Sequence, residues 1–424
     1  MFLKNIIKIF KIKDLRNRIL IVLIVFVIFR IMAGIPIPGV NPEELKAFFE
    51  QFQVFGLFNV FTGGTMQNLS IVMLGLGPFI TSTVVLQLLS MIFPQLERIY
   101  KEEGEAGREK FNQLGRLLSI PLAFLQGYTM LTLFQKRGVL QNLTVSASIA
   151  SVISITAGTV LLMWLSEIIS DKGIGNGTSL LIFAGIISSF PQNILQTYSG
   201  LQQDPSQTLS YVLFFILSLF IIFAVVLTSQ AKRNIPVSYA KRVRGRKVYG
   251  GAKTFLPLNL NPAGVMPIIF ALSLLTLPGM LANFFLGAEG YVGKIAQQVS
   301  NLFANPVIYS VFYFFLVLLF TFFYTLIIFD SENISQNLKN TGGFIPGYRP
   351  GKPTAKRLSF ILNRILPIGA SFLGVIALAP TIIGRLTGIM TFQFLVGGTS
   401  LLILVNVVVE TYQEIKSFLQ MQEL

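Results

Sequence analysis

The chain has 424 residues, of which 53% are apolar and only 12% are charged, about half the charged share of soluble domains. That composition excludes a soluble enzyme and a disordered chain. The net charge of +15 is typical of a membrane protein with cationic loops. The sequence contains no cysteine and no histidine, which excludes disulfides, thiol catalysis, the Ser–His pair and the common zinc ligands.

Ten apolar stretches have the length, roughly 20 residues, that a helix needs to cross a bilayer. They are continuous rather than alternating, which argues against a membrane β-barrel. The basic N-terminus leads into the first stretch without a small-residue cleavage site, so we interpret it as an uncleaved span. In chain order the predicted spans are Ile19–Ile35, Leu74–Phe93, Leu117–Phe134, Ile149–Ile169, Thr178–Ile194, Tyr211–Thr228, Val265–Leu286, Val307–Phe329, Ile365–Ile383 and Phe392–Val409.

The charges of the loops predict the orientation of these spans. Of the 33 Lys and Arg residues, 27 fall on the side that carries both termini and only five on the opposite side. Because cytoplasmic loops are enriched in Lys and Arg, this asymmetry puts both termini in the cytoplasm. We therefore expect a multi-pass protein of the cell inner (plasma) membrane, with two long basic cytoplasmic loops at 229–261 and 331–363.

Charged residues are nearly absent from the spans. Arg30, Glu167, Asp330 and Glu410 lie near predicted helix ends, where an interfacial position is the simplest interpretation. The usual proton relay of a coupled transporter and the carboxylate ring of a cation channel are therefore lacking. The nearest candidate for a nucleotide loop, Gly347–Pro353, departs from the Walker pattern. We expect neither enzymatic activity nor a cofactor or metal.

Several segments are unusual for spans or loops. Leu57–Asn68 is too polar and Gly-rich to face lipid, yet too apolar for a free loop. Two interpretations explain this segment equally well. One is a re-entrant element packed inside protein or inside a water-filled cavity, and the other is a loop helix on the outer surface. The fifth span is predicted to be short, because Pro191 ends its apolar stretch. Breaks in the second, fifth and seventh spans fit either helices bent around a central cavity or an ordinary kinked bundle. Gly173–Gly177 predicts a tight turn between the fourth and fifth helices.

The two basic loops have a functional and a simpler interpretation each. Loop 229–261 mixes cations with β-branched residues and is expected to extend as a hairpin around Gly245. It would dock an anionic partner, either ribosomal RNA or an acidic protein face, or it would only set orientation and contact anionic lipid. In loop 331–363, Gly and Pro predict a stiff turn with Arg349 near its tip, which is either a contact point or a solvated turn.

Five strings taken together resemble the SecY family of protein-translocation channels. They are Val237–Arg242, Gly173–Gly177, Asn261–Pro267, Gly347–Gly351 and Gly397–Ile403. The resemblance covers essentially the whole chain. It implies an all-α polytopic membrane protein with ten transmembrane helices in two inverted five-helix halves, 1–205 and 206–424, around a central hourglass pore. The implied function is a protein-conducting channel that passes unfolded secretory polypeptides across the membrane and releases hydrophobic segments sideways into the bilayer.

The resemblance also implies the functional residues. The pore ring would consist of aliphatic side chains at Leu76, Ile80, Ile182, Ile186, Ile269 and Ile403. The plug would span 57–67 and include Asn59, Phe61, Thr62, Gly63 and Gly64. Cytoplasmic partners would dock on Arg242, Arg244, Arg246, Lys247, Arg349 and Lys352. The second and seventh helices would border a lateral gate.

The implied partners are the small membrane subunits SecE and SecG, the SecA ATPase motor, the ribosome, unfolded preproteins with signal peptides, and anionic lipids. Energy would come from a bound motor or ribosome. Two features depart from the family pattern. Leu76 takes a place often held by isoleucine, and the tail carries Glu410, Glu414 and Glu423 against Lys416, so we do not expect the tail to bind RNA. The competing functions are a secondary transporter for a small solute, which needs polar groups at mid-membrane, and a membrane anchor that only recruits a cytoplasmic partner.

Overall fold

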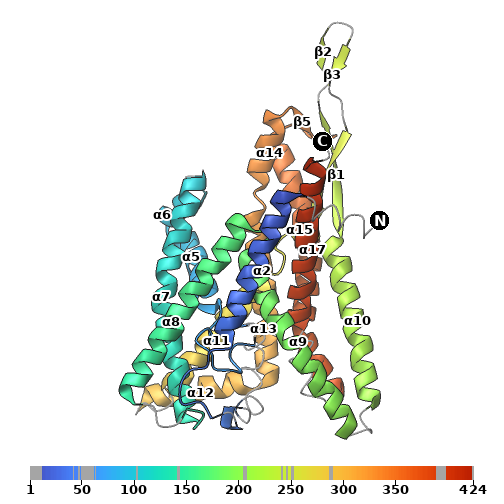
Figure 1. Cartoon of the computed structure of the whole chain (residues 1–424). Helices are drawn as coiled ribbons and strands as arrows, with labels where there is room; N and C mark the ends of the chain where they lie inside the picture. Colours follow the sequence, from blue (N-terminus) through green and yellow to red (C-terminus); the bar gives the residue numbers. More distant parts are fainter. Residues whose placement is uncertain are drawn as a thin grey trace.

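The computed structural model describes residues 12–41, 43–45, 48, 62, 64–101, 104–140, 144–203, 208–239, 242–244, 247–249, 253–285, 290–387 and 398–422. In this part of the chain, long helices form a bundle, and short strands lie at one end of it (Figure 1). The helices are α2 (Lys13–Ala33), α5 (Gly77–Ile92), α6 (Pro94–Lys101), α7 (Gly104–Lys136), α8 (Val145–Lys172), α9 (Gly177–Gln203), α10 (Thr208–Gln230), α11 (Met266–Phe285), α12 (Tyr291–Ala304), α13 (Pro306–Ile328), α14 (Ser331–Asn340), α15 (Lys352–Thr387) and α17 (Gly398–Gln422). The strands are β1 (Lys232–Tyr239), β2 (Arg242–Arg244), β3 (Lys247–Tyr249), β4 (Lys253–Asn259) and β5 (Gly343–Phe344).

Each predicted span overlaps one helix of the described chain. In order these helices are α2, α5, α7, α8, α9, α10, α11, α13, α15 and α17. Five helical stretches meet a membrane-crossing standard by length and hydropathy alone: Glu109–Lys136, Val145–Lys172, Thr208–Gln230, Val307–Asn340 and Lys352–Ala379. Three shorter apolar stretches, Gly77–Ile92, Gly177–Pro191 and Met266–Leu275, belong to α5, α9 and α11. The boundary expected between the two halves, at 205 and 206, lies outside the described residues.

Several helices extend beyond the apolar stretch that predicted them. The prediction that the fifth helix is short is wrong, because α9 continues through Pro191 to Gln203. A proline removes one backbone donor and can kink a helix without ending it. Helices α7, α15 and α17 also continue into polar sequence. An apolar stretch is only as long as the hydrocarbon core of the bilayer. The helix itself can continue into water, because its backbone hydrogen bonds and the helix propensity of its residues still stabilise it there.

Helix α5 begins later than predicted, at Gly77 rather than Leu74. Gly75 has a φ of +56°, a left-handed conformation that glycine adopts without steric cost and that stops a helix from starting earlier. Pro78 then occupies the first turn of α5, where its missing N–H has no partner to lose. Leu76 consequently lies at the N-cap of α5 rather than inside the helix.

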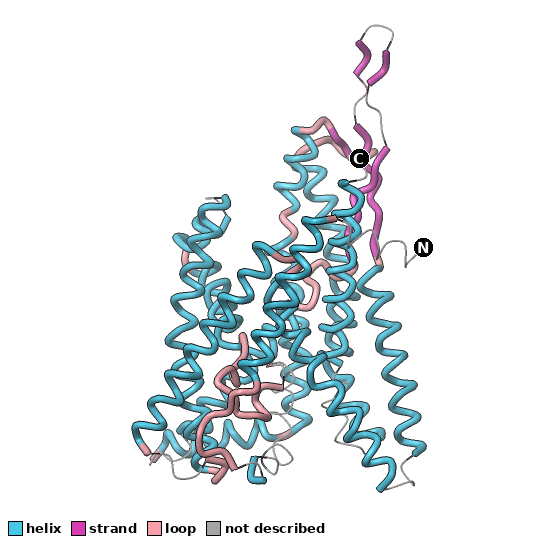
Figure 2. Tube along the Cα trace, in the orientation of Figure 1, coloured by secondary structure: helices cyan, strands magenta, loops and turns pink. Residues whose placement is uncertain are grey.

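One end of the bundle gathers the loops that the sequence assigns to the basic side. The start of α2 meets the α8–α9 turn there, because the Nη1 of Arg18 donates to the Gly173 carbonyl at 3.3 Å. The same guanidinium lies 4.9 Å from the ring centroid of Phe418, near the end of α17. All five strands lie at this end, and β2 and β3 project beyond the helices (Figures 1 and 2).

The apolar interior is continuous through the bundle. One cluster of buried side chains runs from α2 to α17 and includes residues of α5, α7, α8, α9, α11 and α13. A second, smaller cluster, made of Ile235, Leu258, Ile345, Leu358, Ile361 and Ile365, lies beneath the strands. The basic end therefore has an apolar core of its own, which holds the sheet against α15.

Candidate functional site

The six aliphatic residues expected in the pore ring all lie in the interior. Their relative exposures are 5% for Leu76, 4% for Ile80, 4% for Ile182, 5% for Ile186, 1% for Ile269 and 2% for Ile403. All six belong to the same continuous apolar cluster. In the described chain, buried polar side chains are Ser, Thr, Gln and Asn, and none is Asp, Glu, Lys or Arg.

Four helices carry these six side chains, and they pack as two pairs, α5 with α11 and α9 with α17. The Ile80 amide donates to the Leu76 carbonyl at 3.0 Å, so these two residues lie one turn apart at the start of α5. Ile182 and Ile186 are also four residues apart and share one face of α9. Helix α5 packs against α11, which carries Ile269, and α9 packs against α17, which carries Ile403. The aliphatic residues therefore come from α5, α9, α11 and α17, which are far apart in sequence.

The plug-like segment folds back into the bundle through its own hydrogen bonds. The Thr65 hydroxyl donates to the Thr62 carbonyl at 2.9 Å and lies 3.1 Å from the Val72 carbonyl. The Ser70 amide and hydroxyl both donate to the Thr65 carbonyl, at 3.2 Å each. Thr62, Thr65 and Met66 are at most 3% exposed. The buried hydroxyls of Thr65 and Ser70 are thus satisfied within the chain, as buried polar groups require.

The chain that follows this segment packs against α7 and α8, and Gly64 itself lies beside α9. A Cβ on Gly158 of α8 would lie 2.3 Å from the Ile71 carbonyl oxygen, so only glycine fits there. On α7, a Cβ at Gly127 would lie 3.8 Å from Leu74, and a Cβ on Gly64 would lie 3.6 Å from the Cβ of Ser189 on α9. In the described part of Leu57–Asn68, Thr62, Thr65 and Met66 are buried, as the re-entrant interpretation predicts, whereas Gln67 and Asn68 are exposed. Asn59, Phe61 and Gly63 lie outside the described residues.

The turn predicted at Gly173–Gly177 is confirmed. Gly175 has a φ of +81°, and a Cβ on Gly177 would lie 1.8 Å from the Ser166 carbonyl oxygen. The Gly177 amide donates to the Ser170 hydroxyl at 3.0 Å. This tight connection sets the start of α9, and hence the height of Ile182 and Ile186 in the bundle.

The hairpin expected in loop 229–261 is also confirmed. Strands β1 and β4 pair antiparallel from Lys232↔Asn259 to Ser238↔Lys253. Beyond them, β2 and β3 pair antiparallel, with Arg242 opposite Tyr249 and Arg244 opposite Lys247. Three of the expected docking residues therefore lie on the projecting strands, and Arg246 lies outside the described residues.

The turn of loop 331–363 is held rigidly and presents its cations to solvent. Gly347 and Gly351 have φ values of +85° and +95°, and the Thr354 hydroxyl donates to the Arg349 carbonyl at 2.8 Å. From α14, the Ser335 hydroxyl donates to the Gly351 carbonyl at 2.7 Å. Arg349 and Lys352 are both exposed. The stiff turn with Arg349 near its tip is thus confirmed as geometry.

Sequence reasoning missed the pairing that joins the two basic loops. Strand β5 adds to the free edge of β1 through Ser238↔Phe344 and Tyr239↔Gly343, which gives a three-stranded sheet of order β4-β1-β5. The signal for so short a strand is weak, because a two-residue strand has no alternating pattern to detect. As a consequence, the projecting hairpin and the Arg349 turn share one platform.

Two polar contacts between helices were also not predicted. The Arg116 guanidinium of α7 forms an ion pair with Glu167 of α8 at 2.5 Å, which supports the expected position of Glu167 near the end of its span. The Ser229 hydroxyl donates to the buried amide oxygen of Asn406, which connects α10 to α17. Both contacts tie neighbouring helices together.

Comparisons with known proteins agree with this geometry. Residues 70–412 match the SecY family model. The chain is 41% identical over 423 residues to the protein translocase subunit SecY of Thermus thermophilus, covering 97% of this chain and 94% of the relative. It is 40% identical over 426 residues to that of Streptomyces coelicolor, covering 97% and 96%.

The fold matches solved channel structures at 20% sequence identity, each match covering 95% of this chain and 92% of the other. These are a protein-conducting channel with a TM-score of 0.69, a SecY protein whose plug domain stabilises the closed state and maintains a membrane seal, with a TM-score of 0.66, and Sec61 in a canine ribosome–channel complex, also with a TM-score of 0.66. The expectations of a helical, multi-pass membrane protein and of a channel rather than an enzyme are confirmed. The chain belongs to the SecY family of protein-translocation channel subunits.

Proposed function

We propose that Leu76, Ile80, Ile182, Ile186, Ile269 and Ile403 form the constriction of this channel, and that the segment around Thr62 is the plug that closes it. A narrow apolar passage dewets and so blocks ions without any charge. Aliphatic side chains also flex around an unfolded chain without demanding specific hydrogen bonds, which suits a pore that accepts many sequences. The observation that supports the proposal is the approach of Gly64 to Ser189, because Ser189 lies one turn from Ile186 on α9.

Lateral release is proposed to occur between α5 and α11. Helix α11 contacts both α5 and α7 in this structure, which supports a junction of the two expected halves, 1–205 and 206–424, at this place. A segment of roughly 20 apolar residues in the pore partitions outward once these helices part, because lipid solvates it better than a wet pore does. This step needs no chemistry from the chain itself.

The basic end of the bundle is proposed to face the cytoplasm, with both termini on that side. The loop charges support this orientation, and the structure gathers those loops at one end (Figure 1). The β2–β3 hairpin and the Arg349 turn then form a shared docking platform for an anionic partner. A ribosome or the SecA motor would supply the energy for transport, and Sec61, a relative in fold, is solved in a complex with a ribosome.

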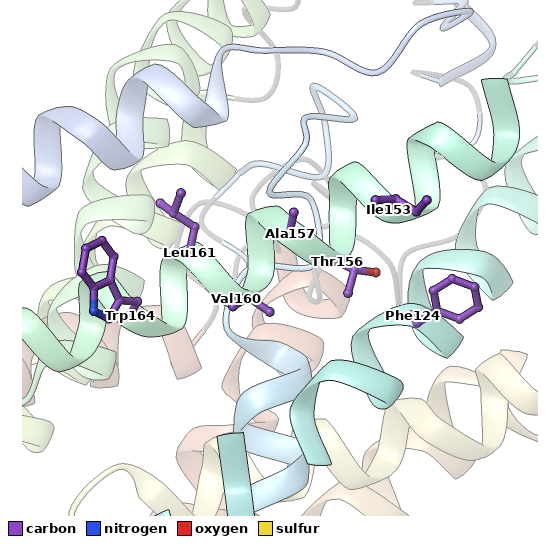
Figure 3. A pocket seen from close by; sticks show the side chains of 7 residues that line it. All are labelled: Phe124, Ile153, Thr156, Ala157, Val160, Leu161 and Trp164. Carbon is purple, nitrogen blue, oxygen red and sulfur yellow. The ribbon is translucent and has the colours of Figure 1, made fainter. Parts of the chain in front are cut away.

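Small membrane subunits such as SecE and SecG are proposed to pack on the lipid-facing side of the bundle. A groove of about 530 Å³ runs along α8 and offers a seat for an apolar helix. Figure 3 shows its lining, which comes from α8 except for Phe124 of α7. Its lining residues are Phe124, Ile153, Thr156, Ala157, Val160, Leu161 and Trp164.

A small-solute transporter has little support. Such a protein gathers charged or strongly polar groups at mid-membrane, whereas the described interior has no buried Asp, Glu, Lys or Arg. A simple membrane anchor has no use for a plug folded into the bundle.

A reversible disulfide tests the plug directly. The Cβ of Ser189 lies 3.6 Å from where a Cβ on Gly64 would lie, within the range of about 3.5–4.5 Å that disulfides use. The chain has no cysteine of its own, so Gly64→Cys with Ser189→Cys forms a unique pair. The φ of +77° at Gly64 adds a strain of about 1–2 kcal/mol.

Oxidation of the double variant should stop preprotein transport into reconstituted vesicles, and a reductant should restore it. Each single-cysteine variant should transport equally well under both conditions. Equal transport by the oxidised and reduced double variant would refute the plug assignment.

A further inference from the structure

Helix α12 lies crosswise to the long helices, at the end of the bundle opposite the strands (Figure 1). A sharp corner fixes this direction. The Asn305 side chain caps α13 by accepting from the Val307 amide at 3.0 Å, and Pro306 occupies the first turn of α13. The ring of Phe303, near the end of α12, lies 6.1 Å from that of Phe312 on α13. The chain therefore turns from α12 into α13 within one residue and holds that angle.

The side chains of α12 fall into three sectors around its axis. One sector packs onto the bundle and contains Ala296, which is 5% exposed, and Phe303, which contacts the main apolar cluster. A second sector is apolar but exposed. Its members are Tyr291 at 86%, Val292 at 52%, Ile295 at 57% and Leu302 at 48%. The third sector is polar and exposed, and it consists of Lys294, Gln297, Gln298 and Asn301.

This order around the helix has a physical meaning. At 100° per residue, the exposed apolar sector adjoins the packed sector, and the polar sector lies on the remaining side. A helix that only covered a protein surface in water would expose polar residues outside its packed stripe. An exposed apolar sector beside a polar one is typical of a helix that lies in the plane of a membrane interface.

The exposed apolar sector opens into a groove between α12 and α11. The groove has a volume of about 260 Å³ and is lined only by apolar residues. Pro278, Ala282 and Phe285 of α11 form one wall, and Val292, Ile295, Ala296 and Val299 of α12 form the other. Because α11 and α12 pack extensively along this wall, whatever fills the groove contacts the C-terminal half of α11.

We propose that α12 is an interfacial lipid-binding helix whose apolar sector, with the α11–α12 groove, takes the acyl chains of membrane lipids. The next helix, α13, also exposes apolar side chains, with Phe312 at 53% and Phe315 at 63%, and it is apolar and long enough to span a membrane. Lys294 and the amide side chains then lie at headgroup level, and Tyr291 has the amphipathic ring found at membrane interfaces. In the orientation proposed above, the leaflet that α12 contacts is the outer one. The lipid site is independent of the pore assignment.

Tryptophan fluorescence tests the site, because the chain has a single tryptophan, Trp164. In a Trp164→Phe background, Ile295→Trp puts a reporter in the apolar sector and Gln297→Trp puts the matched control in the polar sector of the same helix. The full channel, with its small membrane subunits, is reconstituted into vesicles whose lipids carry bromine on the upper acyl carbons. Acrylamide is the water-soluble quencher. A Leu302→Trp variant repeats the first reporter at a second position.

Brominated lipid should quench Ile295→Trp and Leu302→Trp about twofold or more beyond its effect on Gln297→Trp, since an interfacial helix lies roughly 5–10 Å into the headgroup boundary. Acrylamide should give the reverse order. Equal quenching of all three by acrylamide would overturn the proposal, because the sector would then face water. Protection of Ile295→Trp from both quenchers would also overturn it, because a protein partner would then cover the sector.

Discussion

Replacing Ile269 by asparagine should open a leak in the resting channel. Its side chain is 1% exposed on α11 and is proposed to face the constriction. The substitution removes about 1.5–3 kcal/mol of apolar burial, and an amide buried without a hydrogen bond costs about 1–3 kcal/mol more. The closed state therefore loses at least about 2.5 kcal/mol relative to a hydrated one, which corresponds to a rise of roughly sixtyfold or more in the open population.

Ile268→Asn is the matched control, because Ile268 precedes Ile269 on the same helix and is 0% exposed. It loses the same burial but points about 100° away around the helix axis. Ion conductance of both variants is measured in planar bilayers beside the parent channel. We expect leakage from Ile269→Asn and none beyond the parent level from Ile268→Asn. Equal conductance of the two variants would show that general loosening of the bundle, rather than a ring, explains the effect.

Three further predictions concern the docking platform and the packing of α8 against Ile71. Arg349→Glu should impair motor-driven export in reconstituted vesicles while leaving membrane assembly intact. Lys339→Glu, which changes an exposed cation on the neighbouring α14, should leave export unchanged. Matching export by both variants would count against the Arg349 turn as a docking point. Arg242→Glu with Arg244→Glu should weaken ribosome binding and lower the slope of log affinity against log salt by roughly one for each phosphate that is no longer neutralised. The pair Lys232→Glu and Arg233→Glu, at the base of the same loop, is the control, and an equally weakened binding there would point to net charge alone. Gly158→Ala should lower the free energy of unfolding by about 1–3 kcal/mol through overpacking against Ile71. Gly279→Ala, with open space around it, should leave the free energy of unfolding unchanged or raise it by up to about 1 kcal/mol through helix propensity. Thermal unfolding of the purified protein compares the two variants.

Hydropathy and loop charge were sufficient to predict the ten long helices, because a bilayer imposes both a length and a sidedness on them. They could not predict where the helices end. Helix α9 continues past Pro191 and α15 begins at Lys352, since helix propensity and capping, which bilayer thickness does not control, decide those ends. The turn at Gly173–Gly177 was readable because its glycines are required by close backbone contacts.

The candidate site was less accessible from single residues. Composition left the plug-like segment undecided. Its described part lies against α9, where Gly64 approaches Ser189, and α9 comes much later in the chain. The six aliphatic residues carry no signal of their own in a sequence that is 53% apolar, so only the resemblance singled them out. The β1–β5 pairing joins segments about 100 residues apart through two residue pairs, which is too small a signal to read from a pattern.

Photocrosslinking from the ring to a polypeptide in transit tests the central claim most directly. A photoreactive residue replaces Ile186 on α9, and in a second variant it replaces Ile155 on α8, which is 0% exposed but not assigned to the ring. A secretory chain is arrested midway through the channel, and crosslinked products are compared. We expect crosslinks from position 186 and none above background from position 155. An arrested chain that never crosslinks to position 186, or that crosslinks equally to both positions, would contradict a pore lined by these aliphatic side chains.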